Sequence, residues 1–318
     1  MQTTSAPKKW HIDFMRLRWL AFILSLSLSI ASCVLPFTKG LNFGIDFVGG
    51  IVVEIRTDQN VNIGKMRAAL GKLQLGEVAL QNFGGPNDLM IRVQEQDGGA
   101  NAQSAAVDVI KKGLKDAFPD VGIEYRKVDY VGAQVGGELI HAGIMAMLGA
   151  FAAIMAYIWI RFEWQYGVGA IMALLHDATM TIGFYSISGL EFNLTSVAAI
   201  LTIVGYSIND SVVIYDRIRE NLRKYKKMTL LELINVSLNE TLSRTLNTVG
   251  TTLLATLALV LWGGEVIQSF SLAMFFGVIV GTYSSIFISA PLLVYMNLRR
   301  DTASEKKPEG NIVAKPAR

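Results

Sequence analysis

Hydrophobic residues form six long runs along the chain, four of them without any charged side chain and two with a single acid each. A bilayer core about 30 Å thick is crossed by roughly 20 helical residues, and every run reaches that length. The pattern therefore predicts an α-helical integral membrane protein with six transmembrane helices. We place these helices at residues 19–38, 139–160, 164–189, 193–216, 244–263 and 267–297.

The last hydrophobic run, residues 266–298, is 33 residues long and exceeds one upright span. Two spans in that length would leave no room for a turn between them. We therefore expect one helix that is tilted or partly interfacial, with Pro291 near its end.

Residues 39–138 have a different pattern, with short alternating segments typical of strands and two segments with helical spacing. Together they predict the order βαββαβ, that of a ferredoxin-like α+β domain between the first and second membrane helices. About 100 residues suffice to bury a core of their own. The expected strands are 51–56, 77–83, 88–93 and 123–131, with a hairpin connection at 84–87 and helices at 61–73 and 101–118.

Lysine and arginine are concentrated in the segments that would lie on one side of the membrane. Residues 1–18 hold four of them, including Lys8 and Lys9; Arg161 is one more, residues 217–244 hold seven and the tail after 298 holds six. The short loops around Glu191 and Glu265 hold none. The positive-inside rule then places both termini in the cytoplasm and residues 39–138 across the membrane. The cytoplasmic segments are 1–18, 217–243, which includes an amphipathic helix at 230–242, and 298–318.

The first hydrophobic run has one competing interpretation. Lys8 and Lys9 followed by an apolar segment resemble a signal peptide, and residues 30–33 resemble a lipoprotein cleavage site at Cys33. Because the apolar run continues through Phe37, we interpret the segment as a retained anchor.

Composition supports a membrane protein. Hydrophobic residues make up 52% of the chain and charged residues 17%, against about 25% charged in soluble domains. This composition excludes a soluble globular protein and a disordered chain, and the single cysteine excludes an intrachain disulfide. Residues 39–138 carry 11 basic and 13 acidic side chains, whereas the remainder carries 18 and 13. The basic excess therefore flanks the membrane helices and does not indicate a nucleic-acid surface.

An acid inside a membrane helix costs about 2.5–3.5 kcal/mol or more, so Asp210 is the strongest candidate for function. It shares a helical face with Ser207, and Asn209 and Ser211 flank it. These polar groups must face the bundle interior or a wet cavity, where the carboxylate could bind and release a proton. Arg244, at the start of the fifth helix, is the candidate counter-cation. The alternative role for Arg244 is an anchor that snorkels to the membrane surface.

Asp177 follows His176 and interrupts the third helix, and we treat it as a weaker candidate for the same proton relay. It could instead orient Thr179 and Thr181 locally. The chain's three histidines lie on different segments and have no metal-ligand spacing. We also find no nucleophile–base arrangement, no Walker loop and no dinucleotide motif. We therefore predict no catalytic residue, no cofactor, no metal and no ATP hydrolysis, so energy must come from the membrane gradient or a partner.

Small residues suggest where helices pack and where the chain bends. Residues 273, 277, 281, 285 and 289 of the sixth helix are all small, and they include Gly277, Gly281 and Ser285. This stripe predicts close helix packing, within the chain or between subunits. The segments that join the 39–138 domain to the membrane contain glycines that we consider candidate hinges: Gly40, Gly132, Gly136 and Gly137.

Four stretches in order along the chain resemble the SecF family of bacterial protein-export subunits. They are residues 44–50 (GIDFVGG), His176-Asp177, residues 205–211 (GYSINDS) with 216–220 (DRIRE), and residues 242–246 (LSRTL). The resemblance covers about residues 15–300. It implies a proton-driven member of the resistance–nodulation–division superfamily, in which Asp210 matches the family's essential intramembrane acid and Arg244 its membrane arginine.

The resemblance also implies partners and a location. Such subunits pair with SecD in the bacterial inner membrane, expose their soluble domain to the periplasm and assist the SecYEG channel. YajC, unfolded preprotein and membrane lipid are further expected partners, and nucleic acid is not. The proton motive force would drive late translocation and release of the preprotein.

Three alternatives remain open at this stage. The chain could be half of a proton-driven exporter of small molecules or lipids, although such exporters usually carry twelve helices in one chain. It could be a scaffold that stabilises the export machinery without transporting ions. An intramembrane hydrolase is the weakest alternative, because no nucleophile–base pair is evident.

Overall fold

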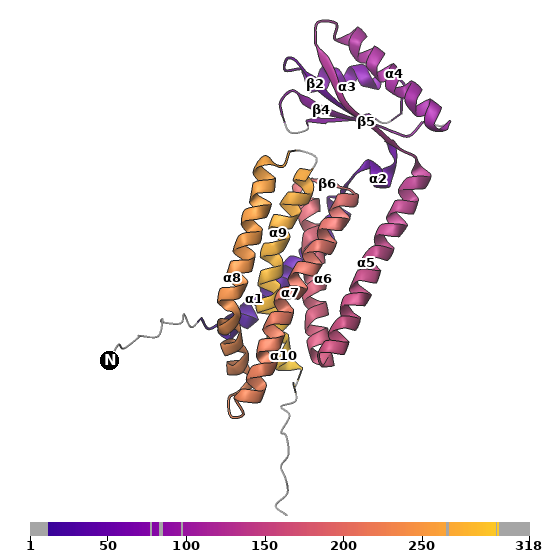
Figure 1. The fold of residues 1–318 in the computed structure, drawn as a ribbon. Helices are drawn as coiled ribbons and strands as arrows, with labels where there is room; N and C mark the ends of the chain where they lie inside the picture. The colour runs from indigo at the N-terminus through magenta and orange to yellow at the C-terminus, as the bar shows by residue number, and fades with distance from the viewer. Residues whose placement is uncertain are drawn as a thin grey trace, which may run out of the picture.

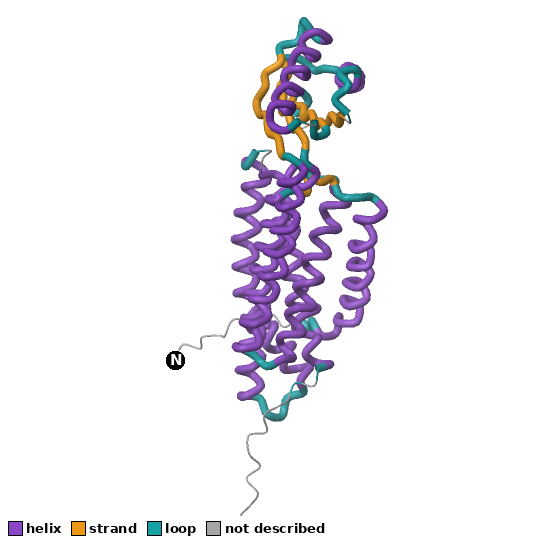
Figure 2. Tube along the Cα trace, turned by 90° about the vertical axis from the view of Figure 1, so that its right-hand side faces the viewer, coloured by secondary structure: helices purple, strands orange, loops and turns teal. Residues whose placement is uncertain are grey.

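The computed structural model describes residues 12–76, 78–82, 85–96, 98–264, 267–296 and 298. Its two parts are a long helix bundle and a small α+β domain at one end of that bundle (Figures 1 and 2). Lys8, Lys9, Glu265 and the tail beyond Leu298, which we used to predict orientation, lie outside the described residues.

Six helical segments of the described chain are long and apolar enough to cross a membrane, which confirms the predicted number. The segments built around α6, α7 and α9 have about half of their apolar core buried by other parts of the chain, whereas α1, α5 and α8 are mostly exposed. The helices are α1 (Arg18–Thr38), α5 (Ala133–Arg161), α6 (Trp164–Ser188), α7 (Leu194–Lys224), α8 (Leu230–Trp262) and α9 (Gln268–Ser284), with a short 3-10 turn, η1 (Met15–Leu17), before α1.

The sixth span contains a change of helix type. After α9 the chain forms a π-helical segment, η3 (Ser285–Ser289), and then α10 (Ala290–Tyr295). Pro291 lies in the first turn of α10. Because proline lacks an N–H and clashes with the preceding turn of an α-helix, the wider π turn accommodates it without ending the helix.

The segment predicted as a separate amphipathic helix at 230–242 is continuous with the fifth membrane span in α8. A capping box between Thr229 and Glu232 starts this helix, and no proline interrupts it. In its first turns Leu233, Ile234 and Leu238 are buried in the core that also contains α7 and α10 residues. The apolar face that suggested an interfacial helix is therefore covered by the chain itself.

The α+β domain has the predicted order βαββαβ. Its sheet has the strand order β3-β4-β2-β5 with every neighbouring pair antiparallel. One face of the sheet packs against the two helices, and this core combines buried side chains of β2 and β4 with Met66, Leu70, Ile110 and Leu114. The elements are β2 (Gly50–Thr57), α3 (Ile63–Gly71), β3 (Val78–Asn82), β4 (Asp88–Val93), α4 (Gly99–Ala117) and β5 (Ile123–Val131).

Short elements that the sequence pattern does not predict join the domain to the bundle. Strand β1 (Asn42–Phe43) pairs in parallel with β6 (Glu191–Phe192), which immediately precedes α7. The single turn α2 (Ile45–Val48) packs against the start of α5. The connections that follow the first and third membrane helices therefore meet directly below the sheet (Figure 1).

Candidate functional site

Asp210 lies on α7 and is 7% exposed. Its Oδ1 accepts a hydrogen bond of 2.7 Å from the Thr245 hydroxyl of α8. Its Oδ2 is buried and has no hydrogen-bond partner among the described residues. The site is thus a carboxylate inside the bundle with one oxygen satisfied and one available to a proton or to a further donor.

Arg244 precedes Thr245 in α8, but it does not contact Asp210. The ion pairs within 4 Å in the described part of the chain include none between these two residues. Arg244 is exposed, on a side of α8 that this chain leaves uncovered. It remains near enough to Asp210 for a charge–charge interaction. The expected direct pairing is therefore absent from the single chain.

Asp177 has a fuller set of partners than Asp210. It lies on α6 and is completely buried. Its Oδ2 accepts hydrogen bonds from Ser207 of α7 at 2.6 Å and from Ser284 of α9 at 2.8 Å. Its Oδ1 lies 3.0 Å from Nδ1 of His176. This residue joins three helices and is a second buried carboxylate rather than a local helix feature.

The polar residues expected around Asp210 are distributed differently. The Ser207 hydroxyl donates a hydrogen bond to Asp177 instead of Asp210, and the Ser211 hydroxyl lies 2.9 Å from that of Ser285. Asn209 is exposed. Thr245, the hydroxyl that does bind Asp210, was noticeable in the sequence only as one of several polar neighbours of Arg244. Its role depends on how α7 and α8 pack, which the sequence pattern does not contain.

The small-residue stripe of the sixth span faces α7 within the same chain. A Cβ placed on Gly277 would overlap the Ile203 side chain, and one on Gly281 would lie 3.0 Å from the Ser207 Cβ. One and two turns further along, Ser285 meets Ser211 and Ser289 meets the Tyr215 hydroxyl at 2.5 Å. The stripe therefore brings two helices into close contact and lines the seam with hydroxyl groups next to Asp177.

The candidate hinge glycines occupy unlike positions. Gly40 has φ of 82° and open space around it. Gly132 is the N-cap of α5, and Gly136 and Gly137 lie inside that helix. A Cβ on Gly136 would lie 3.0 Å from the Phe47 carbonyl oxygen, whereas one on Gly137 would meet nothing within 4 Å. Gly40 is therefore non-helical, with its carbonyl bound by the Ser186 hydroxyl at 2.8 Å, and Gly132 is extended at the start of α5, whereas Gly136 and Gly137 are helical.

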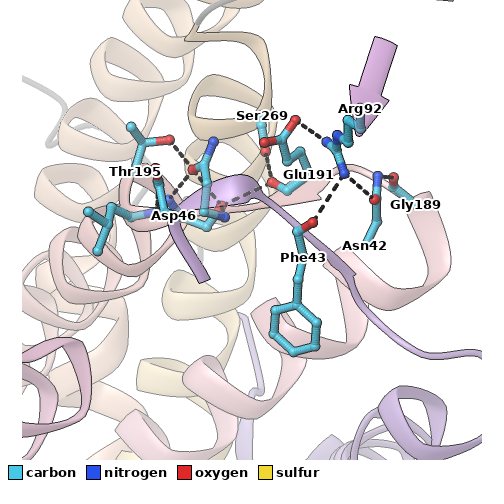
Figure 3. A network of polar contacts seen from close by, with 11 residues as sticks. Asn42, Phe43, Asp46, Arg92, Gly189, Glu191, Thr195 and Ser269 are labelled. Atoms are coloured by element: carbon cyan, nitrogen blue, oxygen red, sulfur yellow. Dashed lines mark hydrogen bonds and ion pairs between the residues drawn. The ribbon is translucent and has the colours of Figure 1, made fainter. Parts of the chain in front are cut away.

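A polar network that the sequence analysis missed lies where the domain meets the bundle (Figure 3). Arg92 of β4 forms an ion pair of 2.5 Å with Glu191 of β6. The signals available in the sequence were weak: an arginine on the polar side of a strand and a lone acid in a short loop. No group of three or more potential metal ligands exists among the described residues.

Comparison with known proteins identifies the family. A family model described as "Protein export membrane protein SecD/SecF, C-terminal" matches residues 109–299, and one described as "SecD/SecF GG Motif" matches residues 34–61. Protein translocase subunit SecF of Rickettsia rickettsii is 57% identical over 290 residues, which cover 90% of this chain and 92% of the relative. The chain belongs to the SecF family.

Other SecF relatives and a solved structure agree. The SecF of Rickettsia akari is 55% identical over 297 residues, covering 92% of this chain and 94% of the relative. The crystal structure of SecDF, a translocon-associated membrane protein from Thermus thermophilus, matches with a TM-score of 0.82 at 34% identity. The match covers 94% of this SecF-family chain and 40% of the SecDF chain. The chain is thus a multi-pass membrane protein that corresponds to less than half of that longer protein.

Proposed function

We propose that this chain is an accessory subunit of the bacterial Sec translocase, which acts with a SecD-type partner to promote late steps of preprotein transport by using the proton motive force. The buried, half-satisfied carboxylate of Asp210 carries this proposal. A charge inside a membrane helix is costly and is retained where it serves a pathway or a relay. The relatives' designation as protein translocase subunits points to protein as the transported substrate.

The exposed face of α8 supports a partner within the membrane. Arg244 and Asn247 are exposed there although they belong to a membrane span. Lipid tails cannot satisfy such groups, so another protein chain is needed to cover them. A SecD-type subunit fits, because this chain matches only 40% of the SecDF structure. The SecYEG channel, YajC, unfolded preprotein and lipid complete the proposed set of partners.

Location follows from the same proposal. The chain would lie in the bacterial inner membrane with both termini in the cytoplasm and the α+β domain in the periplasm. No covalent catalysis is needed, since the proposed work is a conformational step driven by ion flow.

The proposed mechanism begins with a proton at Asp210. Neutralising this carboxylate weakens its interaction with Arg244 and lets the free oxygen donate rather than accept a hydrogen bond. The contact between α7 and α8 at Thr245 then repacks. Asp177, which binds α7 through Ser207, is the second proposed acid of the relay. The shift reaches the domain, with Gly40, Gly132, Gly136 and Gly137 as the proposed bending points.

Asp210→Asn tests this function. We would measure pulse-chase export of a secretory preprotein in cells depleted of the native subunit, at matched membrane levels and matched SecD recovery. The amide preserves shape but cannot carry a proton on and off, so we expect export to fall about tenfold or more, as for loss of an essential relay group. The matched control is Asp216→Asn, on the same helix but 47% exposed and paired with Arg161. Normal export with Asp210→Asn would contradict ion coupling and favour the alternative in which the chain is a scaffold of the export machinery.

A further inference from the structure

The outer end of α7, next to the α+β domain, is fixed by several polar contacts. The Ser269 and Ser196 hydroxyls donate to the Glu191 carbonyl at 2.8 and 3.1 Å. Asn193 caps the helix through a capping box with Ser196. Asp46 of α2 accepts a hydrogen bond of 3.0 Å from the Leu194 N–H in the first turn. The β6 segment is therefore held to the helix that carries Asp210.

Arg92 connects this segment to the domain sheet. Its side chain is 16% exposed, and Nη2 lies 2.5 Å from Glu191 Oε2. Its Nη1 donates to the Asn42 side-chain oxygen and to the Phe43 carbonyl, both at 3.1 Å. One guanidinium thus bridges β4 of the domain, β1 and β6 (Figure 3). The fork geometry of arginine suits several acceptors at once, which a lysine could not match.

The backbone approaches closely enough to exclude a side chain at the centre of this junction. A Cβ on Gly44 would lie 2.6 Å from Glu191 Oε1 and 2.9 Å from the Asn193 Cβ. The Gly44 N–H donates to the Phe192 carbonyl at 2.8 Å. Only glycine allows β1 and β6 to pair here while Glu191 reaches Arg92.

Elsewhere the sheet and the bundle are separated. A cavity of about 400 Å³ lies between them, lined on the sheet side by Val52, Glu54, Lys127 and Asp129. Much of the open face of the sheet therefore has no direct support from the bundle. Among the described residues, the Arg92 junction is a direct polar link between the domain sheet and the segment before α7, and α2 in the connecting segment packs against α5.

We propose that Arg92 and Glu191 are positioning residues that couple the domain to α7, so that movement of the Asp210 helix reaches the domain through this ion pair rather than through the glycine-bearing segments alone. The inference rests on the proposed function. Leu194 and Asp210 are sixteen residues apart in one helix, about 24 Å along its axis. Because a helix transmits tilt and translation along its length, a shift at Asp210 displaces Glu191 and, with it, Arg92.

Charge exchange at the junction tests the coupling. We would compare Arg92→Glu, Glu191→Arg and the double exchange in the complex with SecD, in lipid nanodiscs. Spin labels at Lys112→Cys on α4 and Trp262→Cys on α8, in a Cys33→Ser background, report the distance between domain and bundle by electron–electron double resonance. Arg126→Glu is the matched control, because this arginine is 43% exposed on β5, away from the junction.

We expect each single exchange to raise the population of displaced distances about tenfold, as for loss of one partner of a half-buried charged pair. Export in pulse-chase should fall in parallel. The double exchange should bring both measurements back toward wild type, although a glutamate at position 92 cannot donate to Asn42 or Phe43, and the control should change neither. Distances that stay at wild type in both single variants, or a double exchange no better than the singles, would overturn the coupling.

Combining these variants with Asp210→Asn separates the two proposals. If Arg92 couples the two parts, Asp210→Asn shifts the distance between the α4 and α8 labels when Arg92 is present. In a variant that also carries Arg92→Glu, it causes no additional shift. Lost export in Asp210→Asn together with normal distances in Arg92→Glu overturns the coupling alone. Normal export and distances in Asp210→Asn, together with displaced distances in Arg92→Glu, overturn the proposed function.

Discussion

One buried carboxylate lies on α7 and a second contacts this helix, and the two have unequal hydrogen-bond partners. Asp177 accepts from two serine hydroxyls and lies beside His176, whereas Asp210 accepts only from Thr245 among the described residues. A buried polar group is costly when a partner is missing, so Asp210 is the less stabilised of the two. The acid that we propose as the proton carrier is therefore also the one with an unpartnered oxygen.

The close contact between Gly277 of α9 and Ile203 of α7 gives a prediction about single residues. Gly277→Ala inserts a methyl group into space that the Ile203 side chain already occupies, and overpacking of this kind costs about 1–3 kcal/mol. We expect a lower melting temperature of the purified complex in detergent. Adding Ile203→Ala should recover part of the loss.

Gly205→Ala is the matched control, because a Cβ there meets nothing within 4 Å. It should be neutral or slightly stabilising, since alanine favours the helix by about 1 kcal/mol. Equal melting temperatures for Gly277→Ala and wild type would show that the seam is loose.

Individual acids were visible in the sequence, whereas their partners were not. Asp177 and Asp210 stood out because charge is rare in an apolar run. Thr245 and Ser284 did not, because threonine and serine are common in membrane helices and bind their own backbone there. Arg244 was recognisable as a cation near the site, but its exposure depends on which helices cover α8.

At the scale of elements, long periodic segments were predictable and two-residue contacts were not. The six spans and the order βαββαβ follow from hydrophobic runs and alternation. Strands β1 and β6 have no period to detect, and their pairing depends on tertiary packing around Gly44. The π-helical turn η3 could not be predicted without knowing that the chain continues past Pro291 as a helix.

An ion pair at the ends of the two central strands, β2 and β4, makes a pH-dependent contact in the domain. Arg56 binds both carboxylate oxygens of Asp88, at 2.6 and 2.7 Å, and this hydrogen bonding holds the pKa of Asp88 below its usual value. The pair therefore stabilises the folded domain above the ordinary aspartate range, and the contribution is lost as pH falls through the lowered pKa.

Arg56→Gln should accordingly weaken the domain at neutral pH and have little effect in acid. The measurement is amide hydrogen exchange of β4 in the full-length chain, taken as the difference between variant and wild type at each pH. Arg126→Gln serves as control, because Arg126 lies 3.6 Å from Asp88 in a longer contact. A difference that grows toward low pH would contradict the assigned role of the pair.

At the scale of the whole molecule, the distribution of lysine and arginine predicts how the chain is oriented in the membrane, and this orientation can be tested. The positive-inside rule predicts that Lys112, on α4, faces the periplasm and Lys227, between α7 and α8, faces the cytoplasm. In a Cys33→Ser background, Lys112→Cys should react with a membrane-impermeant maleimide in intact spheroplasts, and Lys227→Cys only after lysis. The reverse labelling pattern would show that the chain has the opposite orientation in the membrane.

The continuity of α8 has a mechanical consequence for the membrane part of the molecule. Its 33 residues make a rod about 50 Å long, while the bilayer core is about 30 Å thick. The part of the helix near Thr229 is attached to α7, where the Asn221 amide donates to the Ser237 hydroxyl. Because Thr245 lies on the same uninterrupted helix, we expect any tilt of α8 beside Asp210 to reach its Thr229 end without crossing a loop.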